Sequence, residues 1–527
     1  MKKPRNTRRI SVISKRSWVA SAILLLAVCL CCCSPSGKSE GGSSIGTKAT
    51  EVDRLKNSWV GLYAQRNEKI ARLLSDGEGW VNFREMALPA AITAFSSGTS
   101  IPERIGKARA CLQLAETFAV LDGFYLKTEA EYLGSPAVKG IPGAAGRLGF
   151  IRLRQGDTDA AGKIFSAAPP RGQEAVWSLG RAGVEVISGK SSGGAALEKA
   201  VKEAPADKTS LALTASYSWG RPAGIKDKSQ YSSAVSSLAG GDFGAAAGAL
   251  ERAGYGSAEE AGPDLFLYDL LRITYAKYAL ASLKTVGGQE AAWLSGRALW
   301  LLKDYEASVS ALAGVTGEQS GTLHPALLFG VIIDGQEMLE VSTALRGASL
   351  IRAGKTAEGT AVLKELLDGD PGAFTLAYLA ELQVGMGIKG PLGNPEQAVN
   401  DSITAIRMDR IKMLEVENGE IASAILGARQ AEICRKASSV VRAGGKSREA
   451  LDLLDSAHQK RKGYKPDFIN PPAFLLDLAS AYAQTGQYAP STEILFELSN
   501  QYPAVRLGYE SLKRLYASRT GGEAPPR

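Results

Sequence analysis

The chain has 527 residues and a formal net charge of +8. Seven uncompensated Lys and Arg residues lie within the first 16 positions, and subtracting them leaves a net charge of about +1 for the remainder. A nearly neutral body argues against electrostatic capture of nucleic acid or of an anionic lipid surface. The two histidines, His324 and His458, are isolated from each other and from cysteine, which excludes a His/Cys metal site and a histidine-based catalytic site.

The first predicted element is a secretory leader. Its basic start is followed by an apolar stretch, 18–30, and then by Cys31-Cys32-Cys33-Ser34. The apolar stretch is shorter than the about 20 residues of a membrane-spanning helix. Leu30 stands three positions before Cys33, as in a bacterial lipobox, so residues 1–33 are interpreted as a lipoprotein signal peptide with Cys33 as the lipid-attachment site. Lipidation at Cys29 and an uncleaved N-terminal anchor are the alternatives.

The residues after the leader indicate where the protein works. Residues 34–50 are rich in Ser, Gly and Lys, which predicts a flexible tether. The interpretation is a bacterial membrane-anchored lipoprotein that faces the periplasm or the cell surface. Ser34 is not the acidic residue that marks inner-membrane retention in some bacteria, so the outer membrane is favoured.

The body is predicted to be all-α. Apolar residues recur at intervals of three and four over 55–74, 265–283 and 403–413, and no convincing strand pattern is present. We divide the body into a helical-repeat segment, 51–255, a second repeat segment, 256–520, and a disordered tail, 521–527.

Breaks between the helices follow a pattern. A small residue in one helix is followed seven positions later by Gly, or by Lys303 in one unit, and a second Ala- and Leu-rich helix begins at once. The small residue lets two helices approach, and the turn glycine takes the left-handed conformation that ends the first helix. The small residues are Gly149, Ala234, Gly296, Gly347 and Ala479, and the turn glycines are Gly156, Gly241, Gly354 and Gly486.

This pattern resembles the tetratricopeptide repeat (TPR) family, most closely over 290–370 and 435–505. The resemblance implies an α-solenoid of antiparallel helix pairs, wound as a right-handed superhelix with degenerate repeats. It also implies a concave groove, lined by the first helix of each pair, in which a protein or peptide partner is bound. HEAT-like pairing remains an alternative for 51–135.

Candidate partner-binding residues lie on one such first helix. Trp293, Arg297 and Trp300 are spaced four and three apart and therefore share a helix face. Trp and Arg frequently dominate binding energy at interfaces. Phe150 and Arg154 occupy the same relative places in an earlier repeat. The alternative is that one or both tryptophans pack in the core between repeats.

The expected function is binding rather than catalysis, with no cofactor and no metal. Gly189-Lys190-Ser191 and Gly445-Lys446-Ser447 lack the upstream glycine of a phosphate-binding loop, and we interpret them as turns between helices. The favoured interpretation is an envelope scaffold or adaptor whose protein or peptide partner is unidentified. The first alternative is an accessory lipoprotein of a transporter that binds a small apolar ligand or lipid. A cell-wall turnover factor is the less favoured alternative.

Overall fold

The computed structural model describes residues 77–222, 229–253, 259–317, 332, 335–387, 394–400, 403, 420–462 and 471–520. The signal peptide, Cys33, the tether 34–50 and the tail 521–527 lie outside the described residues. Thr50–Arg527 form one compact unit, which contains both predicted helical segments. None of the described helices is both long enough and apolar enough to cross a bilayer.

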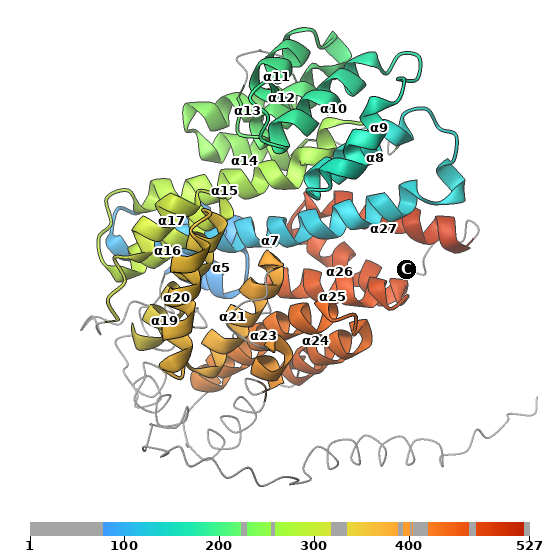
Figure 1. Cartoon of the computed structure of the whole chain (residues 1–527). Helices are drawn as coiled ribbons and strands as arrows, with labels where there is room; N and C mark the ends of the chain where they lie inside the picture. The colour runs from blue at the N-terminus through green and yellow to red at the C-terminus, as the bar shows by residue number, and fades with distance from the viewer. Residues whose placement is uncertain are drawn as a thin grey trace, which may run out of the picture. The chain divides into compact units, whose positions relative to one another are not determined.

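The fold is all-α, as predicted: the described residues form helices and no strand (Figure 1). Consecutive helices joined by short turns pack as antiparallel pairs, which is the arrangement of an α-solenoid. The pairs are α8 (Ala144–Arg154) with α9 (Thr158–Ser166), α10 (Glu174–Ile187) with α11 (Gly193–Lys202), α13 (Gln230–Gly240) with α14 (Phe243–Glu251), α16 (Gln289–Leu301) with α17 (Tyr305–Leu312), α19 (Gly335–Arg352) with α20 (Thr356–Asp368), α23 (Glu420–Ala443) with α24 (Ser447–Lys462), and α25 (Pro472–Gln484) with α26 (Tyr488–Gln501).

Other helices precede, separate or follow these pairs. They are α5 (Glu78–Arg84), α6 (Leu88–Ser96), α7 (Ile101–Leu133), α12 (Thr209–Ser218), α15 (Leu267–Leu283), α21 (Ala373–Met386) and α27 (Val505–Thr520), together with the short 3-10 turns η1 (Pro136–Val138), η2 (Ala206–Lys208) and η3 (Pro263–Phe266).

The predicted close approach of paired helices is confirmed. A Cβ atom on Gly296 would lie 2.4 Å from a methyl carbon of Leu312, and one on Gly347 would lie 2.5 Å from a methyl carbon of Leu363. Twelve residues after Gly296, the Ser308 hydroxyl donates a hydrogen bond of 2.9 Å to the Gly296 carbonyl oxygen. The helices of a pair therefore touch backbone to side chain, with no room for a larger residue.

The turns within the pairs are also as predicted. Gly156, Gly241, Gly354 and Gly486 have φ angles of 80°, 82°, 86° and 80°, in the left-handed region. The aspartate after the turn caps the second helix in three pairs, because its carboxylate accepts from a backbone N–H three residues on. These bonds measure 3.1 Å for Asp157, 3.0 Å for Asp242 and 3.2 Å for Asp304.

One turn carries a lysine where the others carry glycine. Lys303 has a φ of 63°, which its Cβ atom makes unfavourable. We expect the free energy of unfolding of Lys303→Gly to be higher than that of Lys303→Ala by about 1 kcal/mol. Both variants lose the lysine side chain beyond Cβ, but alanine keeps the Cβ atom that is unfavourable at this φ, whereas glycine does not. Urea unfolding of the two variants measures this difference. Equal stabilities would show that the turn bears no strain.

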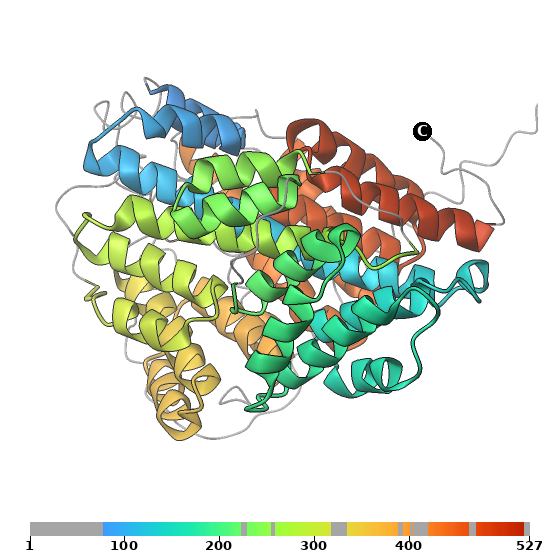
Figure 2. The ribbon, with the colours of Figure 1, turned by 90° about the horizontal axis from the view of Figure 1, so that it is seen from above.

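Helix α7 is the longest described helix and has many neighbours. It begins with a capping box, in which the Ser100 hydroxyl accepts from the Glu103 backbone N–H and the Glu103 carboxylate accepts from the Ser100 N–H. Along its length it packs against α8, α16 and α25, the first helices of three pairs, and against α6, α15 and α27 (Figures 1 and 2). A single helix thus joins early, middle and late parts of the chain.

The last helices return to the beginning of the described chain. The Tyr502 hydroxyl donates to the carbonyl oxygen of Met86. The Tyr268 hydroxyl donates to the Ala504 carbonyl oxygen at 2.8 Å and accepts from the Gly508 backbone N–H at 2.8 Å. All these groups are buried, so each bond satisfies polar atoms that water does not reach.

A buried ionic cluster, which we call the Arg147 cluster, also links the last helix to early parts of the chain. Arg147 on α8 is 1 % exposed and lies 2.9 Å from Glu129 on α7 and 2.7 Å from Asp264 in η3. Glu129 is 0 % exposed and also accepts from the hydroxyl of Ser511 on α27 at 2.6 Å. The cluster joins α7, α8, η3 and α27, and its members are Tyr125, Glu129, Arg147, Asp264, Ser511 and Arg514.

Candidate functional site

Phe150 and Arg154, the candidates from the earlier repeat, face the protein's own interior. Phe150 is 0 % exposed and packs against Phe165, Trp219 and Phe266. The Arg154 guanidinium lies 2.5 Å from the carboxylate of Asp122 on α7. Neither side chain offers a surface to another molecule in this structure.

Arg297, three helix pairs later in the chain, also contacts an acidic residue of α7. Its guanidinium pairs with the carboxylate of Glu116, also on α7, and lies 5.4 Å from the ring centroid of Trp293. Trp293 is 3 % exposed and packs edge-on against Tyr378. This tryptophan therefore packs in the core, which was the alternative to its predicted role in partner binding. Both arginines of the predicted groove face therefore hold acidic residues of α7.

Trp300 and Arg297 stay partly exposed because α7 leaves a pocket beside them. We call it the four-helix pocket: α7, α16, α21 and α23 line it, and its volume is about 280 Å³. Its aromatic residues are Trp300 and Tyr378, and its charged residues are Glu116, Arg297, Glu381, Glu432, Arg435 and Lys436.

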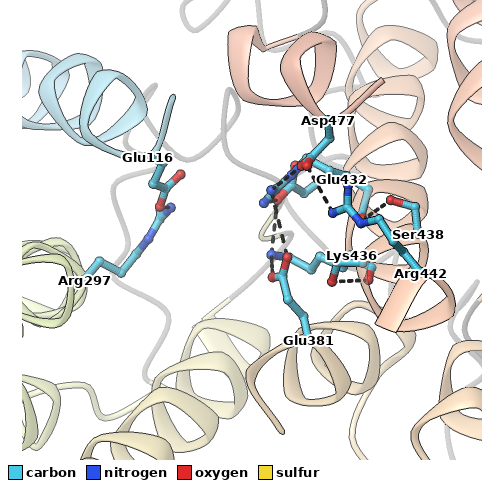
Figure 3. Close-up of polar contacts among 10 residues, drawn as sticks. Glu116, Arg297, Glu381, Glu432, Lys436, Ser438, Arg442 and Asp477 are labelled. Carbon is cyan, nitrogen blue, oxygen red and sulfur yellow. Dashed lines mark hydrogen bonds and ion pairs between the residues drawn. The ribbon is translucent and has the colours of Figure 1, made fainter. Parts of the chain in front are cut away.

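One wall of the pocket is the Glu116–Arg297 pair, drawn apart from the other charged residues in Figure 3. The side chains are 30 % and 26 % exposed, respectively. Burial alone would lower the pKa of Arg297, but the attraction of Glu116 and Tyr378 outweighs it, and the pKa is raised. The only hydrogen bond of this guanidinium to another described residue is made by Nη2, so Nε and Nη1 keep their donors for a ligand.

The facing wall is a denser ionic cluster contributed by α21 and α23 (Figure 3). The Lys436 ammonium lies 2.8 Å from Glu381 and 3.2 Å from Glu432. The Arg435 guanidinium donates to both oxygens of Glu432, at 2.7 and 2.9 Å. Asp477, on α25 behind the pocket, accepts from Arg435 at 3.2 Å and so orients the guanidinium.

These contacts set the protonation states of the wall. Burial alone would raise the pKa values of Glu381 and Glu432, but Arg435 and Lys436 outweigh it. The pKa of Glu381 is lowered, and that of Glu432 falls to about 2. Both carboxylates are therefore charged at any pH at which the protein is expected to work.

The aromatic residues form the rest of the lining. The Lys436 ammonium lies 4.5 Å from the ring centroid of Tyr378, a cation–π contact. Trp300 packs edge-on against Tyr305, with centroids 5.2 Å apart, and remains half-buried. The Tyr378 hydroxyl has no hydrogen-bond partner among the described residues. The pocket can therefore stack an apolar group while offering hydrogen-bonding groups of both kinds.

Stability should fall in acid because of this wall. A carboxylate with a folded-state pKa below its unfolded value stabilises the protein above the unfolded pKa, about 4.3, and loses this contribution as pH falls through the folded pKa. For Glu432, with a folded pKa of about 2, the window is from about pH 5 to pH 2. Urea unfolding across this window should show that the free energy of unfolding decreases as the pH is lowered. In Glu432→Gln the free energy of unfolding should change less with pH. Parallel curves for the two proteins would contradict the expectation.

Sequence reasoning found one side of the pocket and missed the other. Helix spacing identified Arg297 and Trp300, but Glu116 lies 181 residues before its partner Arg297, and Glu381 lies 55 residues before Lys436. The pattern Glu432-x-x-Arg435-Lys436 is visible in the sequence, yet such i, i+3 and i, i+4 charge pairs are common on solvated helix faces. Only the tertiary structure, in which α21 and α23 line the same pocket as α16 and α7, distinguishes it.

Comparisons with known proteins add little to this description. No family model and no curated protein sequence matches the chain. Among solved structures, the crystal structure of the TPR domain of P58(IPK) is similar, with 15 % sequence identity over 86 % of this chain and 98 % of that chain, and a TM-score of 0.17. At that TM-score the likeness carries no argument, and the assignment of the fold rests on the helix pairs themselves.

Proposed function

We propose that this protein is a non-enzymatic binding scaffold that holds a protein or peptide partner at the four-helix pocket. The observation that carries the proposal is the position of Arg297 and Trp300. Both belong to the helix face predicted to bind a partner, and both line a pocket that α7 leaves open. Arginine and tryptophan beside a preformed cavity are typical of sites where binding energy concentrates.

The proposed contact is local because α7 covers the predicted face elsewhere. Asp122 and Glu116 of α7 already pair with Arg154 and Arg297, and Trp293 is buried. A partner that lay along the whole face would have to displace α7. A partner that enters the four-helix pocket meets Trp300 without any such rearrangement.

Crosslinking and pull-down from intact cells test the proposal. We expect wild-type protein to capture a defined partner, and Trp300→Ala to reduce its recovery at least about tenfold, because truncating a tryptophan at an interface hot spot costs about 2 kcal/mol or more. Phe496→Ala is the matched control, since Phe496 is a 52 % exposed aromatic on α26, outside the pocket. Equal loss in the two variants, or capture independent of Trp300, would contradict the pocket as the binding site.

We also propose that the scaffold is a bacterial envelope lipoprotein anchored through Cys33, in the outer membrane. The leader, the lipobox spacing of Leu30 and the nature of Ser34 support this. Metabolic labelling with radioactive palmitate should mark the wild type and Cys29→Ser, and should fail to mark Cys33→Ser. Labelling of Cys33→Ser would contradict the assignment. Separation of the two membranes on a density gradient tests the outer-membrane part.

A ligand-binding accessory of a transporter is the second candidate function. The observation in its favour is that residues of four helices line the pocket, whose volume of about 280 Å³ is close to the lower end of the range of small-molecule sites, about 300 to 1,000 Å³. Native mass spectrometry of protein purified from its own host should then detect a bound small molecule. A ligand-free spectrum together with Trp300-dependent capture of a protein would favour the scaffold.

A further inference from the structure

We propose that the four-helix pocket binds a zwitterion of one or two amino-acid residues, a free amino acid or a dipeptide, with its carboxylate on Arg297 and its ammonium on Glu381. The inference deepens the proposed function, because it takes the same pocket as the binding site and names the chemistry of what enters it. Three observations carry it. Arg297 has N–H groups without a hydrogen-bond partner among the described residues, and one oxygen of Glu381 accepts no hydrogen bond from them. The pocket lining also contains equal numbers of positive and negative groups, together with apolar side chains.

The carboxylate end follows from Arg297. Its Nη2 atom is engaged by Glu116, whereas Nε and Nη1 make no hydrogen bond to any other described residue. The side chain is 26 % exposed and lines the pocket. A guanidinium with two free N–H groups matches the two oxygens of a carboxylate, and a charged donor and acceptor give the stronger class of hydrogen bond.

The ammonium end follows from a difference between the two glutamates of the facing wall. Both oxygens of Glu432 accept from Arg435, so this carboxylate is satisfied. Glu381 accepts from Lys436 through Oε2, while its Oε1 lies 3.9 Å from Arg435, which is too long for a hydrogen bond. Glu381 is 25 % exposed and lines the pocket, so Oε1 is free to accept from an ammonium group.

The balance of charge selects a ligand with no net charge. The lining holds three carboxylates and three cationic groups, and each of them lies within 4.0 Å of an oppositely charged neighbour. A polyanion or a polycation would find as much repulsion as attraction here. A zwitterion can add one ion pair at each wall without leaving an unpaired charge in the pocket.

The apolar lining and the size of the pocket limit the rest of the ligand. Trp300, Leu301 and Leu382 offer an apolar surface against which a ligand side chain can pack. A volume of about 280 Å³ is small even for a small-molecule site. One or two residues with an aromatic or branched aliphatic side chain meet both limits, and a longer peptide would have to extend out of the pocket.

Isothermal titration calorimetry of the full chain tests the inference from the ligand side. The probes are the dipeptide Leu-Phe, its N-acetyl form, which has no ammonium, and its C-terminal amide, which has no carboxylate. We expect the free dipeptide to bind, and each capped form to bind at least tenfold more weakly, because a ligand without one charge leaves a wall group unmatched. Equal affinities for the three probes, or no binding of any, would overturn the inference.

Two variants test the assignment of each end. Arg297→Gln should weaken binding of the free dipeptide and abolish its preference over the amide, while the preference over the acetyl form remains. Glu381→Gln should do the reverse. The control is Arg506→Gln, whose side chain is 74 % exposed outside the pocket, and which should leave both preferences unchanged. If either pocket variant keeps both preferences, the assigned contacts are wrong.

The outcomes separate this inference from the proposed scaffold function. If no dipeptide form binds but a protein is captured through Trp300, the inference fails and the scaffold stands. If the free dipeptide binds with both preferences and no protein is captured, the inference stands and the scaffold fails.

Discussion

Replacing Arg147 with methionine should lower the free energy of unfolding by about 3 to 5 kcal/mol, the usual cost of removing one member of a buried ion pair. The reason is that Arg147 is 1 % exposed and pairs with two carboxylates, Glu129 and Asp264, that are themselves 0 % and 1 % exposed. Methionine keeps much of the volume but no donor. Asp264 would then be a buried carboxylate without its cation, and Glu129 would depend on Arg514 alone for compensation.

The measurement is chemical unfolding followed by circular dichroism. Arg152→Met, on the same helix but at its solvent-accessible side, is the control, and it should change stability by no more than about 0.5 kcal/mol, as surface substitutions usually do. A loss below about 1 kcal/mol in Arg147→Met would show that the cluster relaxes or admits water.

Gly359→Ala should lower the free energy of unfolding by about 3 kcal/mol, at the upper end of the cost of overpacking. A Cβ atom at this position would lie 2.5 Å from the carbonyl oxygen of Gly347 in the facing helix. A side chain can rotate away from such a contact, but a backbone carbonyl can move only with its helix. The expected result is a lower midpoint of urea unfolding, because α19 and α20 must separate.

Gly123→Ala is the matched control for this substitution. Gly123 lies in the middle of α7, and a Cβ atom there would meet no atom within 4 Å. This variant should gain about 0.5 to 1 kcal/mol, because alanine has the higher helix propensity. A loss of stability in both variants would indicate a general effect of the added methyl group rather than the clash with Gly347.

The local rules of the fold could be predicted from the sequence. Gly296 and Gly347 mark positions where a second helix approaches, as expected from their spacing. The side chains that fill the space beside these glycines are Leu312 and Leu363, each from the second helix of the same pair. Such rules depend on residues near each other in the chain, and period and residue size report them directly. The predicted face of α16 was also informative, since Arg297 and Trp300 both line the four-helix pocket.

That α7 packs against the predicted partner-binding face of α16 could not be predicted from the sequence. The sequence over 101–133 shows helical periodicity but no repeat signature, and nothing in it indicates that α7 packs against first helices far along the chain. Trp293 and Trp300 have the same residue type and the same face, yet one is buried and the other lines a pocket. The difference depends on where α7 and Tyr378 lie, which is information from distant parts of the chain.

The contact between Tyr502 and Met86 joins residues 416 positions apart, and this bears on how the protein can fold. In an open solenoid each repeat depends on its neighbours, so the array can lengthen or shorten with little penalty. Here α7 lacks its partners α25 and α27 until nearly the whole chain is available, and ordering so long a loop has an entropic cost before any late contact forms. We therefore expect one cooperative transition for Thr50–Arg527, and truncation from the C-terminal side should leave unfolded chains rather than shorter arrays.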